Sequence, residues 1–152
     1  FIAETGGQNC MVVDSSALPE QVVDDVIMSA FQSAGQRCSA LRVLFIQSDI
    51  AEDVLHMLKG AMASLNAGDP RLLSSDLGPV IDSRAQKELQ AHIDRMHREA
   101  KFIAKVELGS NCENGSFVAP HAFEIDSLDL LTEEVFGPIL HVVRFDSDKL
   151  GA

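Results

Sequence analysis

Hydrophobic and polar positions along the chain follow two periods, and together they predict alternating strands and helices. Residues 10–13 (CMVV) and 41–47 (LRVLFIQ) are apolar at nearly every position, which is typical of strands buried in a parallel sheet. Between them, apolar residues recur every three or four positions from Pro19 until Gly35, and this spacing predicts an amphipathic helix. Proline favours a first helical turn and glycine a helix end, so these two residues mark its limits.

The rest of the chain continues the alternation. A second amphipathic helix is predicted from Asp49 to about Leu65, and a third opens at Ser83, where Gln86 three residues later resembles a capping box. Further strands are predicted within KFIAKVEL, SFVAPHAFEI and ILHVVRF. Strands that alternate with helices predict an α/β fold built on a parallel sheet, and a length of 152 residues fits one domain.

Charge narrows the class of partner. The chain carries 12 Lys and Arg against 23 Asp and Glu, which gives a formal net charge of −11. Such a balance repels phosphate backbones and anionic lipid headgroups, so we expect no nucleic-acid partner for this segment. No apolar run approaches the roughly 18 residues that span a bilayer, so we expect no transmembrane segment either.

Cysteine usage favours a reducing compartment. Cys10, Cys38 and Cys112 are odd in number and show no CxxC spacing, which argues against a disulfide framework and a thiolate zinc site. The histidines form no HExxH pattern, so we assign no metal.

Because the cysteines favour a reducing compartment, we expect a cytoplasmic protein. The chain starts at Phe1 and enters a strand almost at once, so we also expect a piece of a longer polypeptide.

Cys38 is the cysteine best placed to react. It lies just after a predicted helix end, between Arg37 and Ser39, whereas Cys10 lies in an apolar strand and Cys112 in an irregular turn. A nearby cation or backbone dipoles favour the thiolate, which is the nucleophilic form. A buried structural thiol is the alternative for any single cysteine.

Glu4 is the second candidate for chemistry. It precedes Gly6, Gly7 and the first strand, where partial desolvation would raise the pKa of a carboxylate and suit it to accept a proton from water. A surface glutamate at a turn is the alternative. The chain has no GxGxxG or Walker loop, so most of any nucleotide site would lie elsewhere.

Three blocks, ETGGQN at 4–9, GQRCSA at 35–40 and EEVFGP at 133–138, occur in an order that resembles the signature of the aldehyde dehydrogenase superfamily. The similarity runs through almost the whole chain and includes DLGPVID and GSFVAP. It is greatest to the branch of pyrroline-5-carboxylate (glutamate semialdehyde) dehydrogenases that occurs in bifunctional proline-catabolic enzymes. Gln8 stands where the wider family commonly has lysine, and glutamine there favours this branch.

The resemblance implies roles for five side chains. Cys38, at the family's cysteine position, would attack the aldehyde, and the hemithioacetal would give up hydride to NAD and become a thioester. Glu4 would activate the water that hydrolyses this thioester. Glu134 would hydrogen-bond the nicotinamide ribose, and Phe136 would pack near the nicotinamide, with plain core packing as its alternative. Ser39 would help to hold the substrate carboxylate.

The resemblance also implies that residues 1–152 are part of an aldehyde dehydrogenase catalytic domain, an incomplete parallel α/β fold without the Rossmann-like cofactor domain. Most of the NAD site and an oxyanion-binding asparagine would lie upstream, and a loop that grips the substrate carboxylate downstream, so we expect the isolated chain to be inactive. FAD would belong only to a separate proline dehydrogenase domain of a bifunctional parent. Expected partners are a small-molecule aldehyde, the rest of the polypeptide and further copies in a homo-oligomer.

Three other interpretations stay open. The aldehyde could differ, because the blocks report the reaction better than the substrate. The chain could be a non-catalytic oligomerisation or interaction module derived from such an enzyme, although a core needs neither Cys38 nor Glu4. A cysteine hydrolase that pairs Cys38 with His121 or His141 has no spacing to support it, and it would act without NAD.

Overall fold

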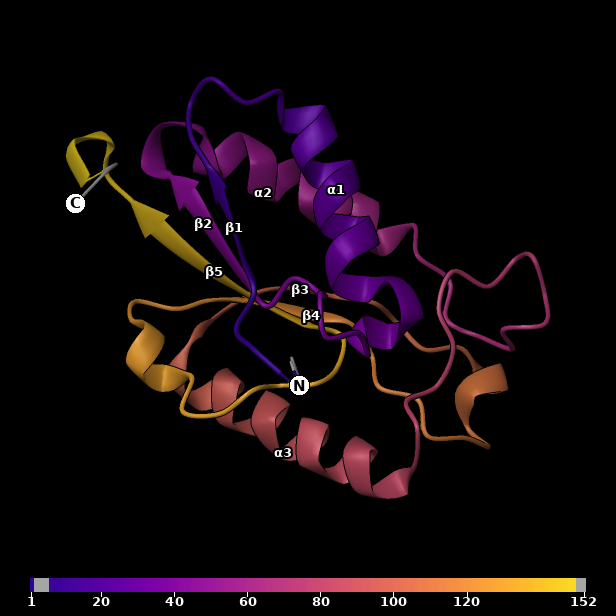
Figure 1. Cartoon of the computed structure of the whole chain (residues 1–152). Helices are drawn as coiled ribbons and strands as arrows, with labels where there is room; N and C mark the ends of the chain where they lie inside the picture. The colour runs from indigo at the N-terminus through magenta and orange to yellow at the C-terminus, as the bar shows by residue number, and fades with distance from the viewer. Residues whose placement is uncertain (2–5, 150–152) are drawn as a thin grey trace.

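The computed structural model describes Phe1 and residues 6–149, and these residues form one sheet with helices on both faces (Figure 1). The strand order is β1-β2-β5-β4-β3. Neighbouring strands run parallel except for β3 and β4, which are antiparallel. The expected α/β fold is confirmed, with one antiparallel pair at an edge. The strands are Cys10–Val13 (β1), Val43–Gln47 (β2), Lys101–Lys105 (β3), His121–Glu124 (β4) and Ile139–Phe145 (β5).

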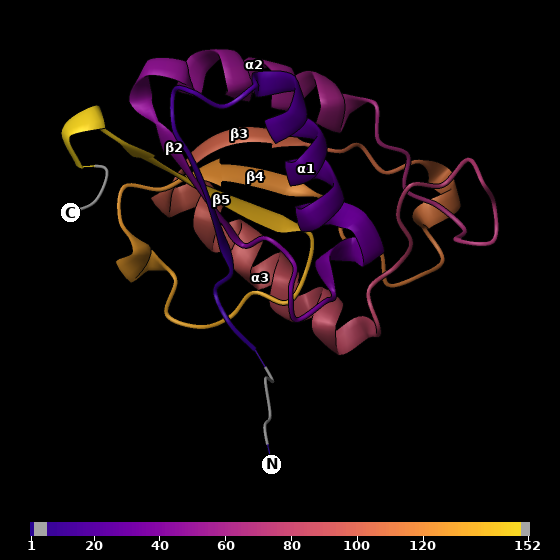
Figure 2. The ribbon, with the colours of Figure 1, turned by 45° about the horizontal axis from the view of Figure 1, so that its top comes forward.

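The helices lie on both sides of this sheet. Pro19–Phe31 (α1) and Ser48–Ala63 (α2) cover one face, and Ser83–Glu99 (α3) covers the other (Figure 2). A short 3₁₀ turn at Gln32–Gly35 follows α1, and its last three residues all have positive φ. Gly35, at φ 65°, therefore stops the helical segment as the sequence predicts. Other 3₁₀ turns lie at Ser110–Cys112, Leu128–Leu130 and Ser147–Lys149.

Each face of the sheet has its own hydrophobic core. Val26 of α1 and Leu58 of α2 pack with Leu44 of β2 on one face. Ile93 of α3 packs with Phe123 of β4 on the other. Full burial of such a side chain contributes about 1.5–3 kcal/mol, so the two cores stabilise the packing of the helices on both faces of the sheet.

Two local predictions are wrong. The first strand was expected to be buried, but in β1 only Val13 is buried, while Cys10 and Val12 are exposed, because β1 pairs on one side only and forms a sheet edge. The capping box at Ser83 does not form. Asp82 caps α3 instead, since its carboxylate accepts from the Ala85 N–H at 2.8 Å.

The order of the strands decides where the sequence blocks meet. Strands β1, β2 and β5 are adjacent and parallel, so the segments that lead into them reach the sheet at the same edge. Residues 6–9 of the first block lead into β1, the block around Cys38 leads into β2, and residues 133–138 lead into β5. The fold therefore brings the three blocks together at the amino ends of these strands.

Candidate functional site

Hydrogen bonds link the three blocks directly. The Gln8 amide donates to the Glu133 carbonyl at 2.8 Å, which joins the first block to the third. The Asn9 amide donates to the Cys38 carbonyl at 2.5 Å, which joins the first block to the second. Segments more than 90 residues apart in the chain are thus joined, and Cys38 lies in one of them.

Cys38 lies in a tight turn just before β2. The Ala40 N–H closes the turn on the Arg37 carbonyl at 3.1 Å, so Cys38 and Ser39 occupy its two central positions. Both residues are exposed. The turn therefore presents the thiol, with the Ser39 side chain as its neighbour, to any molecule that approaches this edge of the sheet.

The Arg37 guanidinium bonds to the end of α1. Its guanidinium donates to the carbonyl oxygens of Met28 and Ser29 near the end of α1, at 3.0 and 3.4 Å. These bonds satisfy carbonyl groups that a helix end leaves free. Arg37 thus anchors the Cys38 turn to α1.

Asn9 holds the turn from the side of β1. Its amide nitrogen donates to the Cys38 carbonyl and also to the Ala40 carbonyl at 3.2 Å. Its own backbone carbonyl accepts from the N–H groups of Arg42 and Val43, at 2.9 and 3.1 Å. The side chain of Asn9 therefore binds the middle and the end of the turn, and its backbone binds the residues that follow the turn.

Arg42 lies beneath the turn and is completely buried. Its Nη1 donates to the carbonyls of Gly35 (2.7 Å) and Gly137 (3.2 Å), and its Nη2 donates to the carbonyl of Arg37 (3.1 Å). Nη2 also lies 3.6 Å from Oε1 of Glu134. Burial lowers the pKa of Arg42, and the negative charge of Glu134 opposes this shift.

Glu134 and Phe136 border a hollow of about 580 Å³ between α3 and the segment before β5. The Phe136 ring is 44% exposed and packs over the Arg42 guanidinium, with Cζ 5.1 Å from the ring centroid. Glu134 Oε1 is buried and makes no hydrogen bond to any described residue. A partly exposed carboxylate and an open aromatic face suit a ligand that carries hydroxyl groups and a flat ring.

A pair of histidines lies next to Arg42. The Nε2 atoms of His92 and His141 are 2.9 Å apart, and His141 Nδ1 lies 3.2 Å from the Arg42 carbonyl. Burial lowers the pKa of His141 to about 3 and that of His92 to about 4, with Arg95 adding to the effect on His92. Both rings are therefore neutral at pH 7. His141 uses both ring nitrogens in these contacts, which argues against a role as the base of a cysteine hydrolase.

Glu4 lies outside the described residues. Cys112 is buried, and its thiol donates to the Ala67 carbonyl at 3.4 Å, so it has a structural role. Within residues 6–149, no group of His, Cys, Asp and Glu could hold a metal ion. No helix in this part of the chain is long and apolar enough to cross a membrane.

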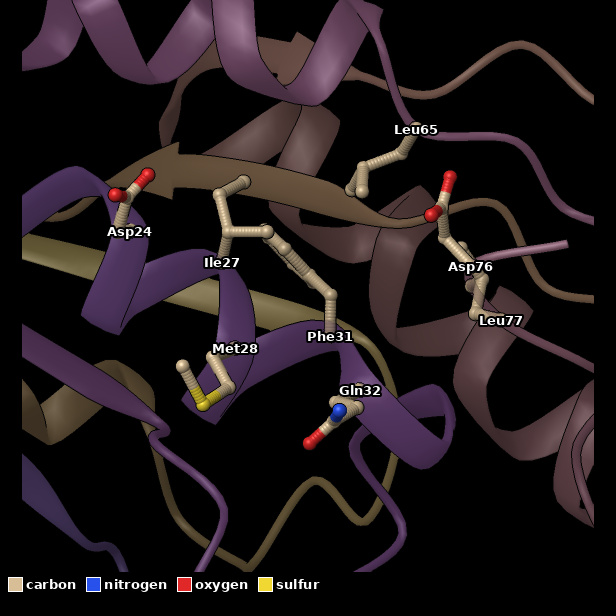
Figure 3. Close-up of a pocket in the computed structure, with 8 residues that line it drawn as sticks. All are labelled: Asp24, Ile27, Met28, Phe31, Gln32, Leu65, Asp76 and Leu77. Carbon is tan, nitrogen blue, oxygen red and sulfur yellow. The ribbon is translucent and has the colours of Figure 1, made fainter. Parts of the chain in front are cut away.

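A second hollow, of about 350 Å³, lies beside α1 and shares no lining residue with the first (Figure 3). Asp24 and Asp76 stand at opposite sides of an apolar floor that includes Ile27 and Phe31 (Figure 3). The carboxylate of Asp76 accepts from the Asn66 N–H at 2.7 Å, so it stabilises the loop that follows α2. None of the residues in the three blocks lines this hollow.

The sequence reasoning missed Asn9 and Arg42. Arg42 had a visible signal, because it is the single charged residue in the otherwise apolar run LRVLFIQ. A charge in a buried strand must be paired or hydrogen-bonded, and its partners are often functional. Asn9 had a weaker signal, as the polar end of the first block.

Comparison with known proteins agrees with the three blocks. A profile described as the Aldehyde dehydrogenase family matches residues 1–150. The chain is 51% identical over 155 residues to the Bifunctional protein PutA of Escherichia coli (strain K12), an alignment that covers 99% of this chain and 12% of that protein. It is 33% identical over 141 residues to the 1-pyrroline-5-carboxylate dehydrogenase of Geobacillus thermodenitrificans (strain NG80-2), which covers 91% of this chain and 27% of that protein.

Solved structures give the same result. A crystal structure of bifunctional proline utilization A (PutA) matches with a TM-score of 0.91 and 53% sequence identity, over 96% of this chain and 14% of that one. The chain therefore spans only a small part of the length of its PutA relatives. Because the family profile covers nearly all of its residues, the chain belongs to the aldehyde dehydrogenase family.

Proposed function

We propose that this chain is part of the catalytic domain of a longer dehydrogenase that oxidises L-glutamate semialdehyde, formed from pyrroline-5-carboxylate, to L-glutamate in proline catabolism. The observation that carries the proposal is the exposed Cys38 turn, which lies where the three family blocks meet. The names of the relatives, a PutA and a 1-pyrroline-5-carboxylate dehydrogenase, support this substrate over other aldehydes.

Cys38 acts as the nucleophile in this proposal. Its thiolate forms a bond to the aldehyde carbon, and the carbonyl oxygen takes the electron pair, so that the carbon becomes tetrahedral. NAD, when bound, supplies the acceptor for the hydride whose departure leaves a thioester on Cys38. Glu4 then accepts a proton from the water that attacks the thioester, and the thiolate leaves as the product carboxylate forms.

Glu134 and Phe136 are the residues proposed to hold the nicotinamide end of NAD. Glu134 lines the hollow and its side chain is 22% exposed, so its carboxylate can accept from a ribose hydroxyl. The open face of Phe136 can pack against a planar ring. Both residues border the same hollow, which supports a shared ligand.

Ser39 is proposed to help bind the substrate carboxylate. It is exposed and occupies the turn position next to Cys38, so its hydroxyl can reach a molecule that is bound to the thiol. The remaining carboxylate contacts would come from the rest of the polypeptide. A reducing, cytoplasmic setting is part of the proposal, and the three free cysteines support it.

The test is formation of NADH from pyrroline-5-carboxylate by the complete polypeptide that carries this chain. We expect Cys38→Ala to abolish turnover and Cys10→Ala, which removes another exposed thiol, to leave it intact. The 152-residue chain alone should form no NADH. Activity that survives Cys38→Ala would refute the nucleophile. Activity with other aldehydes but not with this one would keep the reaction and refute the substrate.

A further inference from the structure

Arg42 makes an unusual set of contacts for a residue at the start of a strand. It is completely buried, and its guanidinium donates to carbonyl oxygens of two separate segments. Gly35 and Arg37 belong to the segment that carries Cys38, and Gly137 belongs to the segment that carries Glu134 and Phe136. One side chain thus connects the nucleophile turn to the proposed cofactor-binding segment.

The segment that carries Cys38 and the segment that carries Glu134 meet at two glycines, Gly35 and Gly137, which have no side chains to pack together. A Cβ on Gly35 would collide with the Gly137 carbonyl, so the two backbones touch directly. Arg42 Nη1 lies between the carbonyl oxygens of these same two glycines. The Gly137 carbonyl also accepts from the Ile139 N–H at 2.8 Å, so Arg42 adds a second donor there and joins this carbonyl to that of Gly35.

A simple core role does not account for this arginine. Taking a guanidinium out of water costs several kcal/mol, and an apolar side chain of similar size would fill the same space without that cost. The contacts to Glu134 at 3.6 Å and to the Phe136 ring at 5.1 Å place the guanidinium against both proposed cofactor-binding residues. The planar guanidinium can donate to several carbonyl oxygens and still stack against the Phe136 ring, which the ammonium group of a lysine cannot do.

Asn9 holds the part of the Cys38 turn that Arg42 does not contact. Arg42 binds the carbonyl at the start of the turn, that of Arg37, while Asn9 binds the carbonyls of Cys38 and Ala40. The backbone N–H of Arg42 also donates to the Asn9 carbonyl at 2.9 Å. The two residues therefore hold the turn as one unit.

We propose that Arg42, together with Asn9, is a positioning residue that fixes the Cys38 turn relative to Glu134 and Phe136. This inference rests on the proposed role of Cys38 as nucleophile. The sulfur must be held within bonding distance of the substrate carbon, and the residues that would hold the hydride acceptor must keep a fixed position relative to it. A misplacement of about 1 Å costs on the order of 10²-fold in rate, so a fixed distance between the two segments matters for catalysis even though Arg42 touches no reacting atom.

The test uses the complete polypeptide, with Arg42→Lys, Arg42→Met and Asn9→Ala as variants. Arg144→Met is the matched control, because Arg144 is also an ion-paired arginine of the sheet but lies near the carboxyl end of β5. For each variant we would measure kcat per folded active site, KM for the aldehyde and for NAD, and the rate of Cys38 alkylation by iodoacetamide.

We expect Arg42→Lys to lower kcat about 10²-fold with a changed alkylation rate, since lysine keeps the charge but not the fork. Asn9→Ala should lower kcat about 10-fold, and it keeps the test valid if the Arg42 variants fail to fold, because Asn9 is only partly buried. Arg144→Met should stay within about threefold of the parent in kcat.

The outcomes separate this inference from the proposed function. If Cys38→Ala abolishes turnover while folded Arg42→Lys and Asn9→Ala keep the parent kcat and alkylation rate, Cys38 remains the nucleophile and the positioning role is refuted. If Cys38→Ala stays active, the proposed function itself fails. A loss of kcat in Arg42→Met that is absent from Arg42→Lys would show that only the charge matters, which also overturns the geometric role.

Discussion

Gly35 and Gly137 lie in direct backbone contact, since a Cβ on Gly35 would collide with the carbonyl oxygen of Gly137. Gly35 also has a φ of 65°, a value that favours glycine. The contact joins the end of the α1 segment to the segment before β5. The approach of the Cys38 turn to Glu134 and Phe136 thus depends on a position where no side chain fits.

Gly35→Ala is therefore expected to destabilise the chain by at least about 2 kcal/mol, because left-handed strain and a steric clash add together. Gly60→Ala is the matched control. Gly60 lies exposed in α2, and a Cβ there would have nothing within 4 Å, so alanine should stabilise by about 0.5–1 kcal/mol. Urea unfolding of both variants measures the difference. Equal stability of the two would contradict the close contact.

Glu134→Gln is expected to raise KM for NAD about tenfold in the complete polypeptide, because a hydrogen bond from a ribose hydroxyl to a charged acceptor contributes more than one to an amide. Glu113→Gln should leave this KM unchanged, because Glu113 is exposed and does not line the hollow. Steady-state kinetics with varied NAD measures both. An unchanged KM in Glu134→Gln would remove Glu134 from the cofactor site.

The fold could be predicted well where the pattern of apolar and polar residues was compatible with only one kind of structure. The run 41–47 is apolar except at Arg42 and Gln47, because β2 lies between β1 and β5 with helices on both faces, and most of the run is buried as predicted. The equally apolar CMVV was misread, because sequence alone does not tell an edge strand from a central one. The cap of α3 was misread by one residue, since Asp82 and Ser83 are both good cap residues.

At the candidate site, too, some residues could be predicted from the sequence and others could not. Cys38 lies in an exposed turn after a helix end, as the glycine and the polar neighbours indicated. The residues that hold it were not predictable from spacing. Asn9 and Arg42 act across strands that are adjacent in the sheet but distant in the chain, and strand order is a tertiary property.

The isolated 152-residue chain is expected to bind NAD weakly or not at all. It offers the hollow beside Glu134 and Phe136, but its sequence has no glycine-rich phosphate loop. Half of a dinucleotide site gives little affinity, so we expect no saturation below about 1 mM NAD. Isothermal titration calorimetry measures this. A micromolar dissociation constant would contradict the view that most of the cofactor site lies outside the chain.

The hydrogen bonds of the His92–His141 pair define which ring nitrogens carry protons. A carbonyl oxygen only accepts, so His141 Nδ1 donates to Arg42 and its Nε2 must accept. His92 Nε2 is then the donor across the 2.9 Å contact. This leaves His92 Nδ1 as the acceptor that faces Arg95 Nη2 at 3.4 Å. Each ring thus has one proton, and a further proton on His141 Nε2 or His92 Nδ1 would face another donor.

Acid should therefore destabilise the chain through this pair. Burial lowers the pKa of both histidines in the folded state, to about 3 for His141 and about 4 for His92, whereas both titrate near 6.5 when unfolded. Between pH 6.5 and 4 the unfolded state binds more protons, so the free energy of unfolding falls as the pH falls. From pH 6 to 5 the loss should be about 1 kcal/mol for each histidine.

Urea unfolding at pH 7, 6 and 5 checks this pH dependence, with His92→Gln as the variant, since the glutamine amide can still donate to His141. The variant should lose less stability than the parent between pH 6 and 5, by about 1 kcal/mol. His56→Gln, on the exposed face of α2, is the control and should follow the parent. Burial also lowers the pKa of His121, and this contribution cancels between parent and variant. Parallel curves for parent and His92→Gln would show that the pair is not neutral in the folded chain.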